Sequence, residues 1–485
     1  MKEERVNEPV AMKTRLGWCV YGGCGDASAS SLNYHACGCN SNHDLQDLVK
    51  DYFTQGDVGT KPAMELVSAE DRRAQLILQQ TTVRSGERYE TGLLWKHDVV
   101  EFPESYGMAL RRLKCLERRM TRNPSLKENL NRPKKEYQQK SYAHQVTDEE
   151  LKVADLKRVW YLPLGAVVNS RKPEKVRLIW DAAATVNGIS LNGPDQLASL
   201  TGVLSRFRQF AVALSADIKE MFHQIRIREV DRHSQRFLRR DDPADLPKIF
   251  VMDVAIFGST CSPASAQYVK NQNAAEFTND FPKAVEDIVN NTYVDDYLTN
   301  YDTEAEAEET AAQVKEIQLK GGFLLRNWHS NRANVILNLG EPSETSHKYV
   351  FMDKTKKYER VLRMLWLTDE DALSFCTRLK DDVQQIICSD SRPTKRQVLR
   401  CLMSYFDPLG LLSHLLVHGK ILLQDVWRTG IQWDEQVNET HSERWRRWTA
   451  LLQCISDIRV PRCYFSEATI EHYCQLQLHV FPCNW

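Results

Sequence analysis

Apolar residues recur at helical spacing in several parts of the chain. Between residues 105 and 121 they return every three or four positions, at Leu110, Leu113, Leu116 and Met120. This spacing puts them on one face and predicts an amphipathic helix. Further helices are expected over 69–80, 262–278 and 304–320, and over most of the chain after Thr394, with a break at 407–410. Gly321 and Gly322 follow the helix at 304–320 and are typical of a helix C-terminus.

Short runs rich in β-branched and aromatic residues predict strands. These runs are WYLPLGAVVN (160–169), KVRLIWDAA (175–183), QFAVALSADI (209–218) and KIFVMDVAIFG (248–258). The first two are expected to surround a turn at 170–174. TYVDDYL (292–298) is typical of a strand pair, or of a hairpin with its turn at the aspartates. The charged stretch 122–150 is expected to be a loop-rich linker. Strands and helices mix without strict alternation, which indicates the α+β class.

Composition narrows the class of protein. A chain of 485 residues can form two or three domains. It has no apolar run of the roughly 20 residues that span a bilayer, and its N-terminus lacks the apolar core of a signal peptide. The 13 cysteines are odd in number and show no pairing pattern, so free thiols in a reducing compartment are expected. We therefore expect an intracellular protein, cytoplasmic or nuclear, without a membrane partner.

Charge is distributed unevenly, although the formal net charge is only −1. From Arg111 to Lys140 there are 11 Lys and Arg residues against 3 Glu, a net of +8 (11 − 3). Such a stretch can bind a phosphate backbone. It can equally be the solvated face of a helix, and charge alone leaves both interpretations open.

Two adjacent aspartates, Asp295 and Asp296, stand inside the strand-like run 292–298. Aspartate is depleted in strands, and neighbouring carboxylates repel each other. A divalent metal explains both features, because Mg²⁺ prefers carboxylate oxygens together with substrate phosphates. Asp217, at the end of an apolar strand, supplies a third carboxylate. A regular strand points adjacent side chains to opposite faces, so Asp217 and Asp295 are predicted as main ligands and Asp296 as a supporting one.

Several motifs, in one order along the chain, resemble those of reverse transcriptases. Tyr293-Val294-Asp295-Asp296 resembles the YxDD box, and ADIKEMFHQI (216–225) resembles the first catalytic palm motif. KVRLIWDAAATVNGISLN (175–192) is similar to the fingers strand, FGSTCSPASAQ (257–267) to the palm floor, and LKGGFLLRNWHSN (319–331) to the motif after the catalytic hairpin. Further segments resemble the pol polyprotein of Bel/Pao-type LTR retrotransposons: GERYETGLLWK (86–96), SYGMALRRLKCLERRM (105–120) and FDPLGLLSHLLVHGKILLQDVW (406–427). This resemblance covers roughly residues 14 to 481.

The resemblance implies a role for individual residues. Asp217, Asp295 and Asp296 would hold two Mg²⁺ or Mn²⁺ ions. Lys175 and Arg177 would meet the triphosphate of a deoxynucleotide, and Phe222 would exclude a ribose 2′-OH. Gly258, Ser262 and Pro263 would shape the floor under nucleotide and template–primer, beside Tyr293. Lys320 would protonate the pyrophosphate. The alternatives are a strand-edge cation at Arg177, a core side chain at Phe222 and a helix-end lysine at Lys320.

The implied fold is a right-hand polymerase with fingers, an antiparallel palm sheet and a thumb, followed by a mostly helical C-terminal region. The expected divisions are a protease-end remnant and linker (1–60), a helical extension (61–150), fingers and palm (151–345), a thumb-like primer-grip region (346–400) and a helical connection region (401–485). The implied partners are an RNA or DNA template with its primer and dNTPs. The sequence gives no sign of a stable protein partner.

Some features depart from the family pattern. The sequence contains no Asp-Thr-Gly or Asp-Ser-Gly, and Asp26-Ala27-Ser28 lacks the glycine, so no protease activity is expected. The chain ends without the acid of an RNase H strand, so a truncation before RNase H, and no RNase H or integrase activity, are expected. Arg363 stands where similar sequences carry glycine. An N-terminal group could bind zinc, although its spacing matches no familiar finger: Cys19, Cys24, Cys37, Cys39, His35 and His43.

Two functions remain open on the sequence. The chain is an RNA-directed DNA polymerase, or it is an inactive remnant or host-retained fragment that binds nucleic acid through its basic stretches. A third interpretation, an unfolded remnant, predicts a non-cooperative melt.

Overall fold

The computed structural model describes two compact units, Met1–Ala69 and Glu70–Trp485. The described residues are 10–14, 17–21, 34–36, 68–169, 172–191, 199–340, 359–362, 364–375, 379 and 381–464. In the first unit, β1 (Val10–Thr14), β2 (Gly17–Tyr21) and β3 (Tyr34–Ala36) form an antiparallel sheet in that order. Cys19 lies opposite His35 in this sheet. The side chains of the predicted zinc group, the triplet Asp26-Ala27-Ser28 and Arg363 lie outside the described residues.

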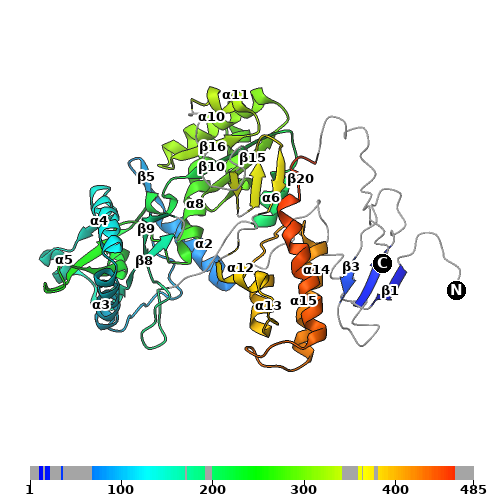
Figure 1. The fold of residues 1–485 in the computed structure, drawn as a ribbon. Helices are drawn as coiled ribbons and strands as arrows, with labels where there is room; N and C mark the ends of the chain where they lie inside the picture. The colour runs from blue at the N-terminus through cyan, green and yellow to red at the C-terminus, as the bar shows by residue number, and fades with distance from the viewer. Residues whose placement is uncertain are drawn as a thin grey trace. The chain divides into compact units, whose positions relative to one another are not determined.

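A four-stranded sheet forms the centre of the second unit (Figure 1). Its strands, in spatial order, are β14 (Thr292–Tyr293), β15 (Asp296–Tyr301), β10 (Val212–Ile218) and β16 (Leu325–Ser330). All three pairings are antiparallel. β10 is buried along almost its whole length, as its run of apolar residues predicts. This burial makes β10 the strand that fixes the position of its two neighbours.

Helices cover this sheet. α10 (Glu304–Lys320) packs against β10, β15 and β16, and it contacts α8 (Cys261–Ala275), α9 (Pro282–Asn290) and α11 (Ala333–Asn338). α10 begins at Thr303, whose side chain accepts a hydrogen bond from Glu306 N, and it ends where Gly322 takes a φ of +81°. α6 (Leu200–Arg206) contacts β14 and β15, and its residues share a cluster with Trp366 and Leu373 from a second sheet.

A second group of elements surrounds the hairpin of β8 (Leu164–Asn169) and β9 (Lys172–Trp180). α3 (Tyr106–Arg122) packs on β8 and α4 (Pro124–Gln139) packs on β9. Two further sheets complete the group: β6 (Ala143–Gln145), β13 (Lys248–Met252), β12 (Arg236–Arg239) and β7 (Tyr161–Leu162); and β11 (Ile225–Ile227), β5 (Arg88–Thr91) and β4 (Val83–Ser85). The group shares one continuous hydrophobic core with the central sheet.

The prediction of a loop-rich linker at 122–150 is wrong. That stretch contains α4, β6 and the start of α5 (Asp148–Val153). Asn123 caps α4 ahead of Pro124, Leu126 and Leu130 are buried, and Thr147 and Glu150 form a capping box for α5. The high charge belongs to exposed helix faces. The predicted turn at 170–174 is also too long, since β9 already begins at Lys172.

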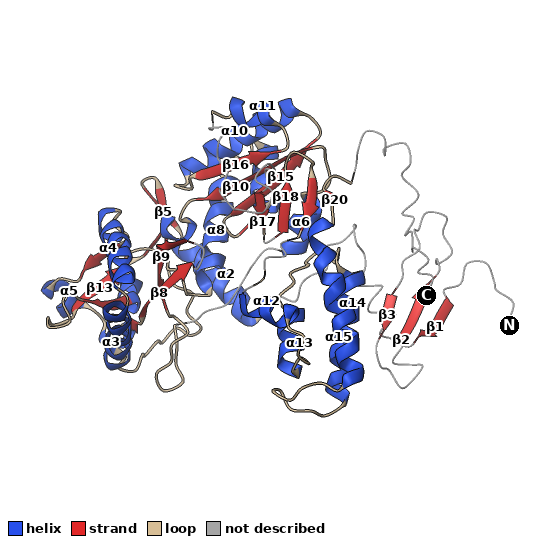
Figure 2. Ribbon diagram, viewed as in Figure 1, coloured by secondary structure: helices blue, strands red, loops and turns tan. Residues whose placement is uncertain are grey.

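The C-terminal part combines a small sheet with a helical layer. The sheet contains β17 (Glu359–Val361), β18 (Met364–Leu367), β19 (Ala372–Ser374) and β20 (Val460–Pro461). The helices are α12 (Asp381–Cys388), α13 (Lys395–Leu402), α14 (Ser413–Arg428) and α15 (Glu439–Leu452). α14 and α15 run side by side around their own core (Figure 2). Buried Arg462 joins this part to the central sheet, because it donates to Asp371 and to the carbonyls of Phe207, Phe210 and Ala211.

The α+β class is confirmed, as are the expected helices at 69–80, 105–121, 262–278 and 304–320, observed as α2 (Ala69–Thr81), α3, α8 and α10. The break at 407–410 is confirmed as well, since α13 ends at Leu402 and α14 begins at Ser413. Among the described residues, no helix has the length and apolar character needed to cross a membrane.

Candidate active site

The two adjacent aspartates lie in a tight hairpin. Tyr293 on β14 pairs with Asp296 on β15, so Val294 and Asp295 form the connecting turn. Val294 has a φ of +54°, a left-handed conformation that is rare for a β-branched residue. Gln267 on α8 donates a 3.4 Å hydrogen bond to the Val294 carbonyl and supports this turn. Of the two arrangements that the sequence left open, the hairpin with its turn at the aspartates is confirmed.

Asp217 lies directly across from this hairpin. In the pairing of β10 with β15, Asp217 is the partner of Asp296, and the Ile218 N–H donates to the Asp295 carbonyl at 2.7 Å. The three predicted aspartates therefore occupy neighbouring backbone positions at one end of the central sheet. Sequence distance gives no hint of this proximity, which results from the register of the two strands.

The other neighbour of β10 contributes two residues that the sequence interpretation missed. β16 carries a bulge opposite Asp217, where the register shifts between Ser215 and Asp217. Asn327, in this bulge, has a φ of +53°, which asparagine tolerates better than most residues. Arg326 Nε donates to Asp217 Oδ2 at 2.9 Å, and Asn327 Nδ2 donates to Asp217 Oδ1. Both oxygens of Asp217 are thus bound by β16.

The pKa of Asp295 is raised from its ordinary value. Protein atoms crowd the carboxyl, although its side chain at the tip of the turn keeps contact with solvent, and desolvation is the largest cause of the shift. The negative charge of Asp217 raises the pKa further, while Arg177 and Arg326 lower it. Arg177 on β9 therefore acts on Asp295 through its charge, while its binding of a triphosphate stays a prediction.

The other predicted nucleotide-binding residues lie on several different elements. Lys175 lies on β9, but its side chain is outside the described residues. Phe222 is half-buried and packs on Phe257, with ring centroids 4.9 Å apart. A Cβ on Gly258 would lie 1.9 Å from the Trp180 carbonyl oxygen, so the close approach that glycine allows here is to β9.

Lys320 ends α10 with its Nζ 2.6 Å from Glu316 and 4.9 Å from the ring centroid of Phe277. Ser262 and Pro263 lie in the first turn of α8, the helix whose Gln267 supports the hairpin turn. Tyr293 is half-buried against the cluster that contains Trp366.

The three aspartates have the right donor chemistry for a divalent metal, but their side chains are not arranged as a metal site. Aspartate oxygens from neighbouring strands are the donors that Mg²⁺ prefers. Within the described ranges, however, no three His, Cys, Asp or Glu side chains are grouped so that they could hold a metal ion. The geometry gives the reason, because Asp217 is turned toward Arg326 and Asn327.

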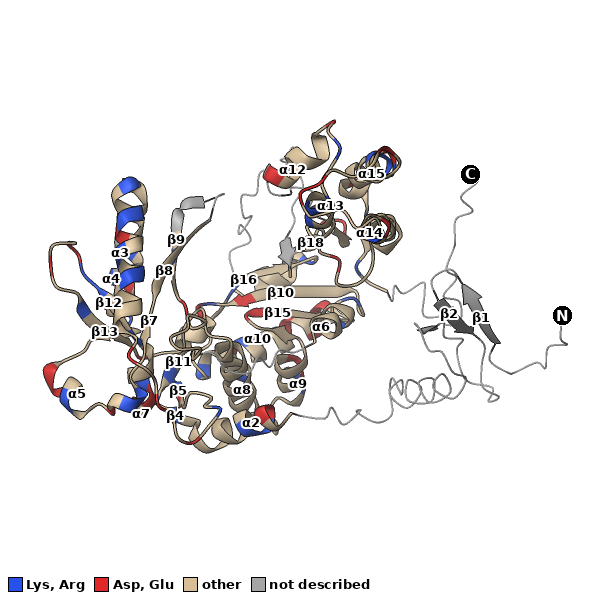
Figure 3. Cartoon of the chain, turned by 90° about the horizontal axis from the view of Figure 1, so that it is seen from below, with Lys and Arg blue, Asp and Glu red and all other residues tan. Residues whose placement is uncertain are grey.

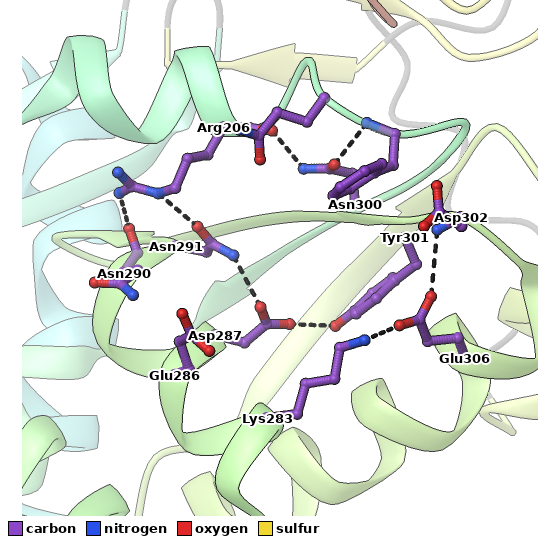
Figure 4. A pocket seen from close by; sticks show the side chains of 12 residues that line it. Arg206, Lys283, Glu286, Asp287, Asn290, Asn291, Asn300, Tyr301, Asp302 and Glu306 are labelled. Atoms are coloured by element: carbon purple, nitrogen blue, oxygen red, sulfur yellow. Dashed lines mark hydrogen bonds and ion pairs between the residues drawn. The ribbon is translucent and has the colours of Figure 1, made fainter. Parts of the chain in front are cut away.

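A separate cavity of about 260 Å³ lies where β15 ends (Figure 4). Asp287 on α9 forms part of its wall and accepts hydrogen bonds from the hydroxyls of Tyr297, Thr299 and Tyr301. Arg206 on α6 donates to Asn291 at 3.0 Å. Because these polar groups bind one another, the cavity wall ties α6 and α9 to the sheet.

The basic stretch predicted from the sequence is divided between α3 and α4. The ribbon of α3 carries several Lys and Arg positions, coloured blue in Figure 3. The exposed basic residues of α3 are Arg111, Arg112, Lys114, Arg118, Arg119 and Arg122. Arg112 pairs with Asp181 at 3.0 Å, and the one acid of the helix, Glu117, is buried against Arg240. The helix therefore has an exposed positive face.

The solved structures that are similar to this chain include two from foamy virus. The protease-reverse transcriptase dRH in complex with ds DNA has a TM-score of 0.47 at 12% identity, over 92% of this chain and 71% of the other. The protease-reverse transcriptase in complex with an RNA/DNA hybrid has a TM-score of 0.45 at 12% identity, over 93% of this chain and 55% of the other. No curated protein matches the sequence.

Residues 394–483 match the family model described as a Pao retrotransposon-like RNaseH-like domain. Our expectation that the sequence stops before any such region is therefore corrected. The matched stretch includes most of the segment that we interpreted as a helical connection, and its described part contains α13, α14, α15 and β20. A final acid was therefore not a sufficient criterion for the presence of such a region. The match confirms the resemblance of this chain to the pol polyproteins of Bel/Pao-type retrotransposons.

Proposed function

We propose that the chain is an RNA-directed DNA polymerase that adds deoxynucleotides to a primer 3′-OH. The observation that carries the proposal is the meeting of Asp217, on β10, with the hairpin that holds Asp295 and Asp296. Arg177 lies close enough to influence Asp295. An acidic centre beside a guanidinium suits a reaction in which a triphosphate must be bound and its charge balanced.

In this proposal the three aspartates hold two Mg²⁺ or Mn²⁺ ions. When bound, such ions activate the attacking 3′-oxygen and neutralise the leaving pyrophosphate. The chain supplies the positioning. Arg177, with Lys175, holds the triphosphate, and Phe222 limits the space at the ribose 2′ position. The β8–β9 hairpin and the central sheet then correspond to fingers and palm, with β17 to β20 and the helices beyond as thumb and connection.

The template and primer lie over α8 and the hairpin in this proposal. Ser262 and Pro263 form the floor with Gly258, and Tyr293 supports the primer side. Lys320 is the weakest assignment, because it is paired with Glu316 at the end of α10. The template is RNA or DNA, since such a groove reads backbone shape more than base edges.

The test is primer extension on poly(rA)–oligo(dT) by the full chain with Mg²⁺ or Mn²⁺. Asp295→Asn removes one carboxylate charge with little change in shape. Asp302→Asn is a matched control, because Asp302 is exposed and lies just beyond the other end of β15. Extension by wild type and by Asp302→Asn, but not by Asp295→Asn, is the expected result.

A second candidate function is nucleic-acid binding without synthesis. The commitment of both Asp217 oxygens to β16 and the exposed positive face of α3 favour it. It predicts salt-dependent binding of the template–primer that Asp295→Asn leaves unchanged, and no extension.

The match at 394–483 favours a third activity, cleavage of the RNA strand of a hybrid. Several acids in the described part of this stretch are already paired, Asp425 with Arg444 at 2.7 Å and Asp434 with Arg396 at 2.8 Å. Incubation with a labelled RNA/DNA hybrid in the absence of dNTPs distinguishes this activity from synthesis.

A further inference from the structure

The surroundings of Asp217 contain a positive charge that polymerase chemistry does not require. Arg326 Nε lies 2.9 Å from Asp217 Oδ2, and the guanidinium also acts on Asp295 through its charge. A cationic side chain therefore stands among the acids at the place where a metal ion would be bound. Carboxylates that face each other across strands repel, and Arg326 relieves this repulsion.

The backbone holds Arg326 in this position. The bulge in β16 makes Arg326 the strand partner of Asp217 and turns Asn327 toward the same carboxylate. Bulges commonly redirect side chains beside functional sites. The two donors differ in one respect, because Asn327 is neutral and occupies Oδ1, whereas Arg326 is charged and occupies Oδ2. Asn327 can thus orient the carboxylate while the other oxygen changes its partner.

The ion pair can open. The Arg326 side chain is 46% exposed and that of Asp217 is 25% exposed, so water can replace either partner. Ion pairs this accessible contribute little to stability, because water screens both charges. A divalent cation with two or three carboxylates is a stronger competitor for the same oxygen.

Building on the proposed function, we propose that Arg326 is the internal counter-ion of Asp217. Arg326 competes with the divalent metal for the Asp217 carboxylate and must leave it when the metal binds. Asn327 is the positioning residue that keeps Asp217 aimed at the site during the exchange. The metal-free centre is thereby neutralised without a bound ion, and metal loading becomes an exchange of one cation for another.

The experiment measures the affinity of the full chain for Mn²⁺ in the absence of nucleic acid. The electron paramagnetic resonance signal of free Mn²⁺, recorded at fixed ionic strength, reports how much of the ion is bound. Arg326→Gln keeps a hydrogen-bonding side chain but removes the charge, and it is expected to tighten Mn²⁺ binding about two- to fivefold. Arg326→Lys retains the charge and should bind Mn²⁺ as wild type does. Arg332→Gln is the control for loss of a nearby charge. Arg332 Nε lies 3.7 Å from Glu304 Oε1, so this arginine is paired with Glu304 and not with Asp217.

A double substitution assigns the effect to Asp217. In an Asp217→Asn background, Arg326→Gln should no longer change the affinity for Mn²⁺. Unchanged or weaker binding by Arg326→Gln, in a wild type that binds Mn²⁺, overturns the counter-ion role and leaves the proposed function standing. Absence of Mn²⁺ binding in both wild type and Arg326→Gln overturns the proposed function as well. Thermal melts of each variant establish that it is folded.

Discussion

Asp217 and Asp296 are strand partners in the antiparallel pairing of β10 with β15. On its other side Asp296 pairs with Tyr293, so the acid stands between an aromatic residue and a second carboxylate. Two carboxylates in this relationship destabilise the sheet unless a cation is near. The structure supplies one in Arg326. The arrangement is thus poorly suited to stability alone, and the proposed metal chemistry accounts for it.

Gly258 provides a test of how β9 is held near the aspartates. Gly258→Ala should lower the free energy of unfolding by about 3 kcal/mol or more, because the added Cβ would meet the Trp180 carbonyl oxygen at 1.9 Å. Gly188→Ala is the matched control, since Gly188 also has a positive φ but nothing within 4 Å. It should cost about 1 kcal/mol. Denaturant unfolding measures both, and equal losses would contradict the close approach.

His144 should make stability depend on pH. Its hydrogen bond to Asp253 at 2.8 Å, aided by Glu150 and opposed by burial, raises the pKa of His144 to about 9. Because the folded pKa lies above the ordinary value of 6.5, the stabilisation is complete below about pH 6.5 and is lost as pH rises toward 9. The difference in unfolding free energy between wild type and His144→Gln should therefore shrink over this range. A difference that grows with pH would contradict the assignment.

Arg462 should be essential to the junction between the C-terminal part and the central sheet. Arg462→Met removes the charge paired with Asp371 and the donor to the carbonyls of Phe207 and Phe210, so a loss of about 3–5 kcal/mol is expected. Arg446→Met is the control, because the Arg446 pair with Glu439 is exposed on both sides. It should change stability by about 0.5 kcal/mol or less. Similar losses in both variants would show that the buried contacts do not hold the junction.

Much of the centre could be predicted from the sequence. Aspartates are so unfavourable in a strand that Asp295 and Asp296 pointed to a hairpin turn, and the apolar run before Asp217 pointed to a buried strand. Both elements are present. Arg326 and Asn327 were missed, because a bulge depends on the register between strands more than 100 residues apart along the chain.

The linker prediction failed for a different reason. The charge of 122–150 outweighed the local helix signals of Asn123, Pro124 and the Thr147–Glu150 pair, which the structure shows to be decisive. The match at 394–483 was not expected, because the sequence prediction depended on one acid among the last residues. Whole-segment similarity carries more information than a single expected side chain.

Primer extension by the full chain, beside Asp295→Asn and Asp302→Asn, tests the central claim most directly. The account predicts dNTP incorporation by wild type and by Asp302→Asn, and a loss of at least about 100-fold in Asp295→Asn, as expected when a charge that acts in the transition state is removed. A folded wild type that binds template–primer but extends nothing, or an Asp295→Asn variant that extends as wild type does, would contradict it.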